Sequence, residues 1–196
     1  NIHTLARKTL LDTFHVAHQD FYRYHFAILD PGGKSVWILE HGGVSEMLLS
    51  TGRRTHFPPP EFGKRQHAQL DAPGMCWDPK RKRIWINSTV GLLEFDPLGK
   101  KYNTSHAAYG LLQNPGYDVY PGISVAPDGR VWYAIGPPRG IQIYDPERST
   151  VMPAFSDLGL QEMVSSDNMV LHCDRDGMIR AGKWSSKGCE FRSQRC

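Results

Sequence analysis

A unit of about 48 residues repeats four times along this chain, and this repetition constrains the fold more than any other feature. Tryptophan stands at positions 37, 85 and 132, and Arg180 takes the same place in the fourth copy, at spacings of 48, 47 and 48 residues. Each of these positions is followed by a glycine, at positions 43, 91, 140 and 188, with spacings of 48, 49 and 48 residues. The tryptophan series and the glycine series have the same period, which indicates a true internal repeat.

Each copy has the pattern of short strands joined by tight turns. In the third copy, Ile123 and Val125 alternate with small or polar neighbours. The segment Pro127-Asp128-Gly129 predicts a turn, because proline fixes φ and glycine accepts a positive φ. The next residues, Val131 to Tyr133, are β-branched or aromatic and suit a half-buried pleated surface. Copies of this length with several strands each are typical of β-propeller blades.

The sequence therefore predicts an all-β protein with four consecutive four-stranded antiparallel blades. A segment of a larger propeller is favoured over a closed ring of four blades. The expected ranges are an outer strand or closure segment at 1–19 and blades at 20–62, 63–108, 109–157 and 158–196. The fourth copy lacks its outermost strand, and a strand at Thr9–Val16 is expected to complete it, or to complete a preceding blade in a longer protein.

Composition and charge exclude several classes of protein. The hydrophobic content of 40% and charged content of 22% are ordinary for a folded domain, and the net charge of +3 gives no reason to expect a nucleic-acid partner. There is no apolar run long enough to span a membrane, so no membrane insertion is expected in this segment. The chain begins at Asn1 rather than Met, and a mature product or a fragment is expected.

Two local clusters have alternative interpretations. The basic run Lys80-Arg81-Lys82-Arg83 falls on a predicted turn, where a solvated loop is favoured over a contact with a polyanion. The four cysteines include no Cys-x-x-Cys pair, which argues against a zinc site. Buried free thiols are favoured, and a disulfide between Cys189 and Cys196 is the alternative in an oxidising compartment. Asp174–Gly177 resembles the start of a calcium loop but lacks the later Glu, and is interpreted as a turn.

The segment Ile84–Pro97 resembles the regulator-type propeller repeat of hybrid two-component histidine kinases, found mainly in gut and soil Bacteroidetes. Its Trp strand, its Gly-Leu pair and its aromatic-Asp-Pro ending match that repeat. Tyr109–Asn114 resembles the Gly-Leu-Gln-Asn connection between late blades of those sensors. The match is good over 72–147, fair over 26–57 and weak over 163–192. The resemblance implies a periplasmic or extracellular sensor of oligosaccharides that signals as a dimer, of which this chain would be a piece.

The same residues are similar to two families of propeller enzymes. Gluconolactonase-type propellers hold a divalent metal through an Asn ahead of the Asp-Gly turn, and Pro73 and Pro121 stand at the matching positions here. Blades of streptogramin (virginiamycin B) lyases carry a Glu after the Trp strand, and only Glu40 preserves it, followed by His41. The enzyme class is therefore the alternative, with no catalytic residue assigned, and a protein-interaction scaffold is the third possibility.

Side chains that break the repeat or stand at strand ends are the candidates for binding. A sugar face stacks on aromatic rings. The candidate ligand-binding residues are Trp77, Tyr117, Asp118 and Tyr120. A hard cation such as Ca²⁺ or Mg²⁺ needs several oxygen ligands that converge. The candidate metal ligands are Glu40, Asn87 and Asp167, with Asp118 as a possible fourth; otherwise no cofactor is expected. The recurring tryptophans are interpreted as blade-packing residues.

Overall fold

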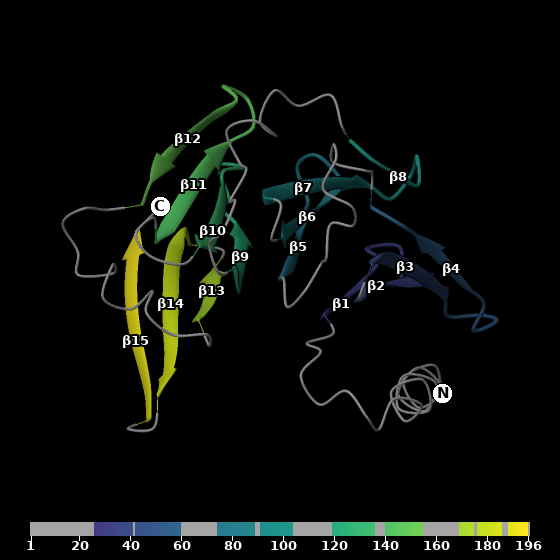
Figure 1. Ribbon diagram of the computed structural model, residues 1–196, viewed down its shortest axis with the longest axis horizontal. Helices are drawn as coiled ribbons and strands as arrows, with labels where there is room; N and C mark the ends of the chain where they lie inside the picture. The colour runs from purple at the N-terminus through teal and green to yellow at the C-terminus, as the bar shows by residue number, and fades with distance from the viewer. Residues whose placement is uncertain are drawn as a thin grey trace.

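A computed structural model describes nine parts of the chain: residues 26–40, 42–59, 74–88, 91–103, 119–135, 140–154, 169–174, 176–185 and 188–195. These parts form fifteen strands and no helix, so they include no helix suited to crossing a membrane. The strands make four antiparallel sheets. Figure 1 shows the sheets following one another along an arc in the order of the sequence.

Each sheet is one blade of the predicted array. Blade 1 contains β1 (Phe26–Leu29), β2 (Ser35–Glu40), β3 (Gly43–Leu48) and β4 (Arg54–Phe57), and blade 2 contains β5 (Met75–Asp78), β6 (Arg83–Ser88), β7 (Gly91–Asp96) and β8 (Lys101–Tyr102). Blade 3 contains β9 (Val119–Val125), β10 (Val131–Ile135), β11 (Ile141–Asp145) and β12 (Thr150–Pro153). Blade 4 contains β13 (Met169–Cys173), β14 (Met178–Ser185) and β15 (Gly188–Arg195).

All fifteen strands fall inside the blade ranges expected from the sequence. Within each blade the strands pair in chain order, each with the next, so the all-β blade prediction is confirmed. The blade boundaries themselves stay predictions. The strand expected at Thr9–Val16 lies outside the described residues.

The repeat in the sequence corresponds to a repeat in register. Trp37 lies opposite Ile28 and Glu46, Trp85 opposite Cys76 and Glu94, Trp132 opposite Ser124 and Ile143, and Arg180 opposite His172 and Ser193. These four residues therefore occupy the same place, the middle of the second strand of a blade. The three tryptophans are 2%, 2% and 1% exposed, which confirms them as packing residues.

Blades 1 and 2 each pack with their tryptophan-bearing face against the next blade. The face of blade 1 that carries Trp37 packs on Ile84 and Ile86 of blade 2. The face of blade 2 that carries Trp85 packs in the same way on Val131 and Tyr133 of blade 3. Successive side chains of a strand point to opposite faces of the sheet. The tryptophan of blade 2 therefore packs against blade 3, while the opposite face of blade 2 contacts the tryptophan of blade 1.

Blade 3 packs on blade 4 in the same orientation, but blade 4 has an arginine in place of the tryptophan. Trp132 packs in one cluster with Leu171, Ile179 and Ala181 of blade 4. The equivalent position of blade 4 holds Arg180, whose side chain is 60% exposed and contacts Asp174. An exposed charged side chain at this position means that none of the other described blades covers the outward face of blade 4.

The recurring glycine has a steric reason in blade 1. Gly43 begins β3 with a φ of 150°, and a Cβ there would overlap the carbonyl oxygen of Phe57 on β4. The backbone of the outermost strand therefore approaches too closely for any side chain. Gly91 and Gly140 also have positive φ, at 123° and 66°.

Antiparallel pairing in chain order sorts the connections onto two rims. One rim, here called the turn rim, carries the first-to-second and third-to-fourth strand turns of each blade, such as 126–130 and 146–149. The opposite rim carries the second-to-third turns and the connections between blades. The predicted turn at Pro127-Asp128-Gly129 is confirmed, with Gly129 at a φ of 91°. Lys82 holds the corresponding left-handed position in blade 2, at a φ of 55°.

Candidate functional site

The structure describes the side chain of only one of the four predicted ligand-binding residues, Trp77. Tyr117, Asp118 and Asp167 lie outside the described residues. Tyr120 lies in β9, and its side chain is outside the described part of the structure. The roles of Tyr117, Asp118 and Tyr120 as ligand contacts, and of Asp167 as a metal ligand, therefore stay predictions.

Trp77, the remaining predicted ligand contact, packs inside the array. It lies in β5, is partly buried, and contacts the hydrophobic cluster between blades 1 and 2 that contains Trp37 and Phe95. An aromatic side chain with this packing stabilises the junction of two blades.

Glu40, a predicted metal ligand, is surrounded by side chains of its own blade. Its Oε2 accepts a hydrogen bond from the Ser45 hydroxyl at 3.0 Å, and its Oε1 is paired with the Arg54 guanidinium. His56 Nδ1 lies 3.1 Å from Ser45 Oγ and 3.7 Å from Glu40 Oε2. These contacts join β2, β3 and β4 on the outer side of blade 1.

Asn87, the second predicted metal ligand, bridges two blades. It is fully buried near the end of β6, and its Nδ2 donates a hydrogen bond of 2.8 Å to the carbonyl oxygen of Ala134 in β10. Within the described residues, no group of three or more His, Cys, Asp or Glu side chains is close enough to hold a metal ion. The cation site with Asp167 stays a prediction.

Two of the cysteines are described, and both are free thiols. Cys76 lies in β5, and burial raises the pKa of its thiol far above the ordinary value, with a smaller contribution from the charge of Asp78. Cys173 lies at the end of β13, where its backbone N–H donates to Ser124 Oγ of blade 3 at 2.8 Å. The Cys189–Cys196 disulfide, the alternative to buried free thiols, involves side chains outside the described part of the structure.

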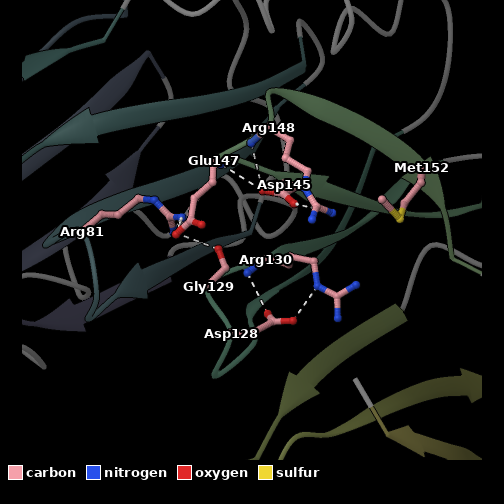
Figure 2. A pocket seen from close by; sticks show the side chains of 8 residues that line it. All are labelled: Arg81, Asp128, Gly129, Arg130, Asp145, Glu147, Arg148 and Met152. Atoms are coloured by element: carbon pink, nitrogen blue, oxygen red, sulfur yellow. Dashed lines mark hydrogen bonds and ion pairs between the residues drawn. The ribbon is translucent and has the colours of Figure 1, made fainter.

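A polar hollow of about 290 Å³ lies at the turn rim, between blades 2 and 3 (Figure 2). Three turns meet there: the β5–β6 turn of blade 2 and the β9–β10 and β11–β12 turns of blade 3. Its lining residues are Arg81, Asp128, Gly129, Arg130, Asp145, Glu147, Arg148 and Met152.

The wall on the blade 2 side is fixed by a buried carboxylate. Asp78 is fully buried and accepts hydrogen bonds from the backbone N–H groups of Lys80 and Arg81, each at 3.0 Å. The Trp85 indole donates to it at 3.1 Å, and Arg81 Nη1 lies 3.0 Å away. A buried polar group needs such hydrogen bonds to replace its contacts with water.

Arg81 connects the buried Asp78 of blade 2 to blade 3. Its Nη1 also donates to the carbonyl oxygen of Gly129 at 2.8 Å, and its Nη2 lies 3.4 Å from Glu147 Oε1. Lys80 Nζ contacts the same Glu147 oxygen at 2.5 Å and holds the pKa of that carboxyl below its ordinary value. The basic run predicted as a solvated loop thus uses two of its members to join blades 2 and 3.

Blade 3 supplies two further arginines to the hollow. Arg130 Nε donates to Asp128 Oδ2 at 2.5 Å, and the backbone N–H of Arg130 donates to Asp128 Oδ1 at 2.9 Å. The Arg148 side chain is 79% exposed, with Nη1 3.8 Å from Asp145 Oδ2. Figure 2 shows the Arg81, Arg130 and Arg148 side chains coming from three sides of the site.

A second hollow of about 300 Å³ lies beside the first, at the ends of the inner strands of blades 2, 3 and 4. Its lining includes Pro79, Val125, Pro127 and Cys173, and is more apolar than that of the first hollow. Asp174 at its edge forms the turn expected for 174–177, because its Oδ1 accepts the N–H groups of Asp176 and Met178.

Sequence reasoning did not single out Arg130 or Arg148. Each arginine follows a turn aspartate within three residues, as Asp128 and Asp145 show. That spacing signals an Asx-type turn with an arginine beside it. It does not reveal that two such turns and Arg81 converge, because the convergence depends on how blade 2 packs against blade 3.

Comparison with known proteins gives matches at the level of structure. No protein family matches the chain, and no curated protein matches it in sequence. The extracellular domain of a B. thetaiotaomicron protein described as a hybrid two-component system matches with a TM-score of 0.62 at 14% identity, over 84% of this chain and 20% of its own. A second such domain matches with a TM-score of 0.54 at 22% identity, over 85% and 22%.

An enzyme is also among the similar structures. Virginiamycin B lyase from Staphylococcus aureus matches with a TM-score of 0.55 at 16% identity, over 92% of this chain and 57% of the lyase. The chain spans about a fifth of the length of the two-component domains. At these identities the matches establish the fold, which is the propeller architecture predicted from the repeat. They also agree with the predicted resemblance to two-component sensor propellers.

Proposed function

We propose that this chain is part of the extracytoplasmic sensor region of a signalling receptor and that it binds a carbohydrate ligand. Two observations support the sensor class: the Ile84–Pro97 repeat, and the similarity of fold to extracellular domains described as parts of two-component systems. A location in the periplasm or outside the cell follows from this class. Signalling through a dimer of the full-length protein would accompany it.

The observation that carries the ligand assignment is the polar hollow between blades 2 and 3. Its volume of about 290 Å³ is at the lower limit of small-molecule sites and suits a unit the size of one sugar ring. It presents guanidinium donors and carboxylate acceptors side by side, which are the groups that hydroxyls bind. Met152 adds an apolar contact for a ring face.

A test of this proposal fills the hollow with a larger side chain. Isothermal titration with a panel of mono- and oligosaccharides should find a binder for the wild-type chain. Met152→Trp should abolish that binding, because Met152 lines the hollow. Thr150→Trp adds the same indole to an exposed position of the same strand, β12, and should bind as the wild type does. Thermal melting of both variants should show that they fold.

Two outcomes would contradict the proposal. One is a panel in which no saccharide binds, and the other is binding that Met152→Trp leaves unchanged.

The similarity to virginiamycin B lyase keeps an enzyme as the second candidate. Glu40, the residue that resembles the lyase pattern, is engaged by Ser45 and Arg54 in blade 1. Turnover of a lactone or of virginiamycin B that requires added Ca²⁺ or Mg²⁺ would favour this alternative. Saccharide binding without turnover would favour the sensor.

A further inference from the structure

The hollow between blades 2 and 3 has more free donors than free acceptors. Arg130 uses only its Nε in the contact with Asp128, so neither terminal nitrogen of its guanidinium has a partner within the described residues. Arg148 Nη1 lies 3.8 Å from Asp145 Oδ2, which is too long for a hydrogen bond. Two guanidinium groups therefore keep unused N–H donors at the site.

The carboxylates of the same hollow are already engaged. Asp128 accepts two hydrogen bonds from Arg130. Asp145 Oδ1 accepts the backbone N–H groups of Glu147 and Arg148, at 2.9 and 3.2 Å. Glu147 is taken by Lys80 and Arg81 of blade 2. Each acid is thus committed to its own turn or to the junction of the blades.

We infer that this hollow selects an acidic saccharide, whose carboxylate or sulfate group binds Arg130 and Arg148. The inference rests on the proposed function and names the class of its ligand. Planar guanidinium groups with free terminal nitrogens bind oxyanions through paired, charge-assisted hydrogen bonds. Lys80 and Arg81, which the sequence singles out as basic, instead position Glu147 and the wall of the site.

Because the charges of the lining nearly cancel, tight binding requires the sugar ring as well as its acidic group. Three arginines and three carboxylates line the hollow, so its formal charge is close to zero. A simple inorganic anion meets both signs of charge there and gains little from the long-range field. Tight binding therefore requires the acidic group on Arg130 and Arg148 together with the hydroxyls of the ring on the remaining polar groups.

The experiment compares matched ligands by isothermal titration. The probes are glucuronate and glucose 6-sulfate, which separate the two sources of the acidic group, with glucose as the neutral match and inorganic sulfate as the free anion. At least one acidic sugar should bind at least about tenfold more tightly than glucose, the loss expected when a charge-assisted hydrogen bond is removed. Inorganic sulfate should bind more weakly than that sugar.

Matched variants locate the effect. Arg130→Gln and Arg148→Gln should each weaken binding of the acidic sugar by about tenfold or more and leave glucose unchanged. Arg53→Gln makes the same change of charge in the corresponding turn of blade 1, away from the hollow, and should have no effect. Glu147→Gln removes a negative charge from the lining and should strengthen binding of the acidic sugar.

The outcomes separate this inference from the proposed function. Equal binding of glucose and the acidic sugars, with no loss in the arginine variants, overturns the inference and leaves saccharide sensing in place. Inorganic sulfate binding as tightly as the acidic sugars also overturns it. A failure of these sugars and of the wider saccharide panel to bind overturns the proposed function as well.

Discussion

The junction between blades 2 and 3 and the outward face of blade 4 are built on the same repeat position with opposite chemistry. At the junction, Trp85 is buried against blade 3, and its ring meets that of Tyr144 edge to face at 5.6 Å. On blade 4, Arg180 holds the same place in the register and lies 60% exposed. The two positions share one geometry, and among the described residues the side chain is apolar where the next blade packs on it and charged where no described blade does.

The polar contacts also differ between the junction of blades 2 and 3 and blade 4. At the junction, Asp78 is buried and binds Trp85 and Arg81, and Arg81 reaches the carbonyl oxygen of Gly129. In blade 4, the hydrogen bonds of the corresponding turn carboxylate Asp174 to described residues go to its own turn and to the exposed Arg180. One aspartate connects two blades, and the other closes a single turn. Substitutions at the two sites should therefore differ in cost.

The largest difference is expected for the repeat position itself. Trp85→Ala removes a fully packed side chain and leaves Asp78 without one of its donors, and should lower the free energy of unfolding by about 3–5 kcal/mol. Arg180→Ala alters an exposed ion pair and should change it by less than about 0.5 kcal/mol. Urea denaturation of both variants measures the difference, and equal costs would show that blade 4 is covered in solution.

A smaller difference is expected for the turn carboxylates. Asp78→Ala leaves the buried Trp85 indole and two backbone N–H groups without their acceptor, and should cost on the order of 3 kcal/mol. Asp174→Ala loses hydrogen bonds that water can replace, and should therefore destabilise the chain much less than Asp78→Ala. The comparison fails if Asp174→Ala destabilises the chain as much as Asp78→Ala, measured in the same urea series.

The smallest effect is a dependence of stability on pH in blade 4. The N–H of Met178 is the main cause that holds the pKa of Asp174 below its ordinary value, with further contributions from Arg180 and Asp176. A carboxyl with a lowered folded-state pKa stabilises the fold above its unfolded pKa, and this contribution is lost as the pH falls through the folded-state pKa. Wild type and Asp174→Asn should thus differ in melting temperature at neutral pH and converge in acid. A gap that stays constant with pH would contradict this assignment.

Much of this contrast can be predicted from the sequence. The spacing of the tryptophans and glycines predicts the strands, the common register and the equivalence of Arg180 with Trp85, because each depends on contacts within one repeat. The turn at Pro127-Asp128-Gly129 follows from local backbone preferences.

The contacts between blades are not encoded locally. The hydrogen bond from Arg81 to Gly129 joins residues 48 positions apart, and the Lys80–Glu147 pair joins residues 67 positions apart. Their partners depend on the rotation of one sheet against the next, so Lys80 and Arg81 look like a solvated loop in the sequence. For the same reason, the sequence does not predict that Arg130 and Arg148 line one site.

The described blades pack in one direction, and no other described blade covers the face of blade 4 that carries Arg180. Amide hydrogen exchange of β6, β10 and β14 tests this most directly, because buried strands exchange only through large openings. The amides of β6 and β10 should exchange with the free energy of global unfolding, and those of β14 should exchange through a smaller opening of blade 4. Equal protection of all three strands would contradict the account, because it would mean that the face carrying Arg180 is covered as fully as the faces carrying Trp85 and Trp132.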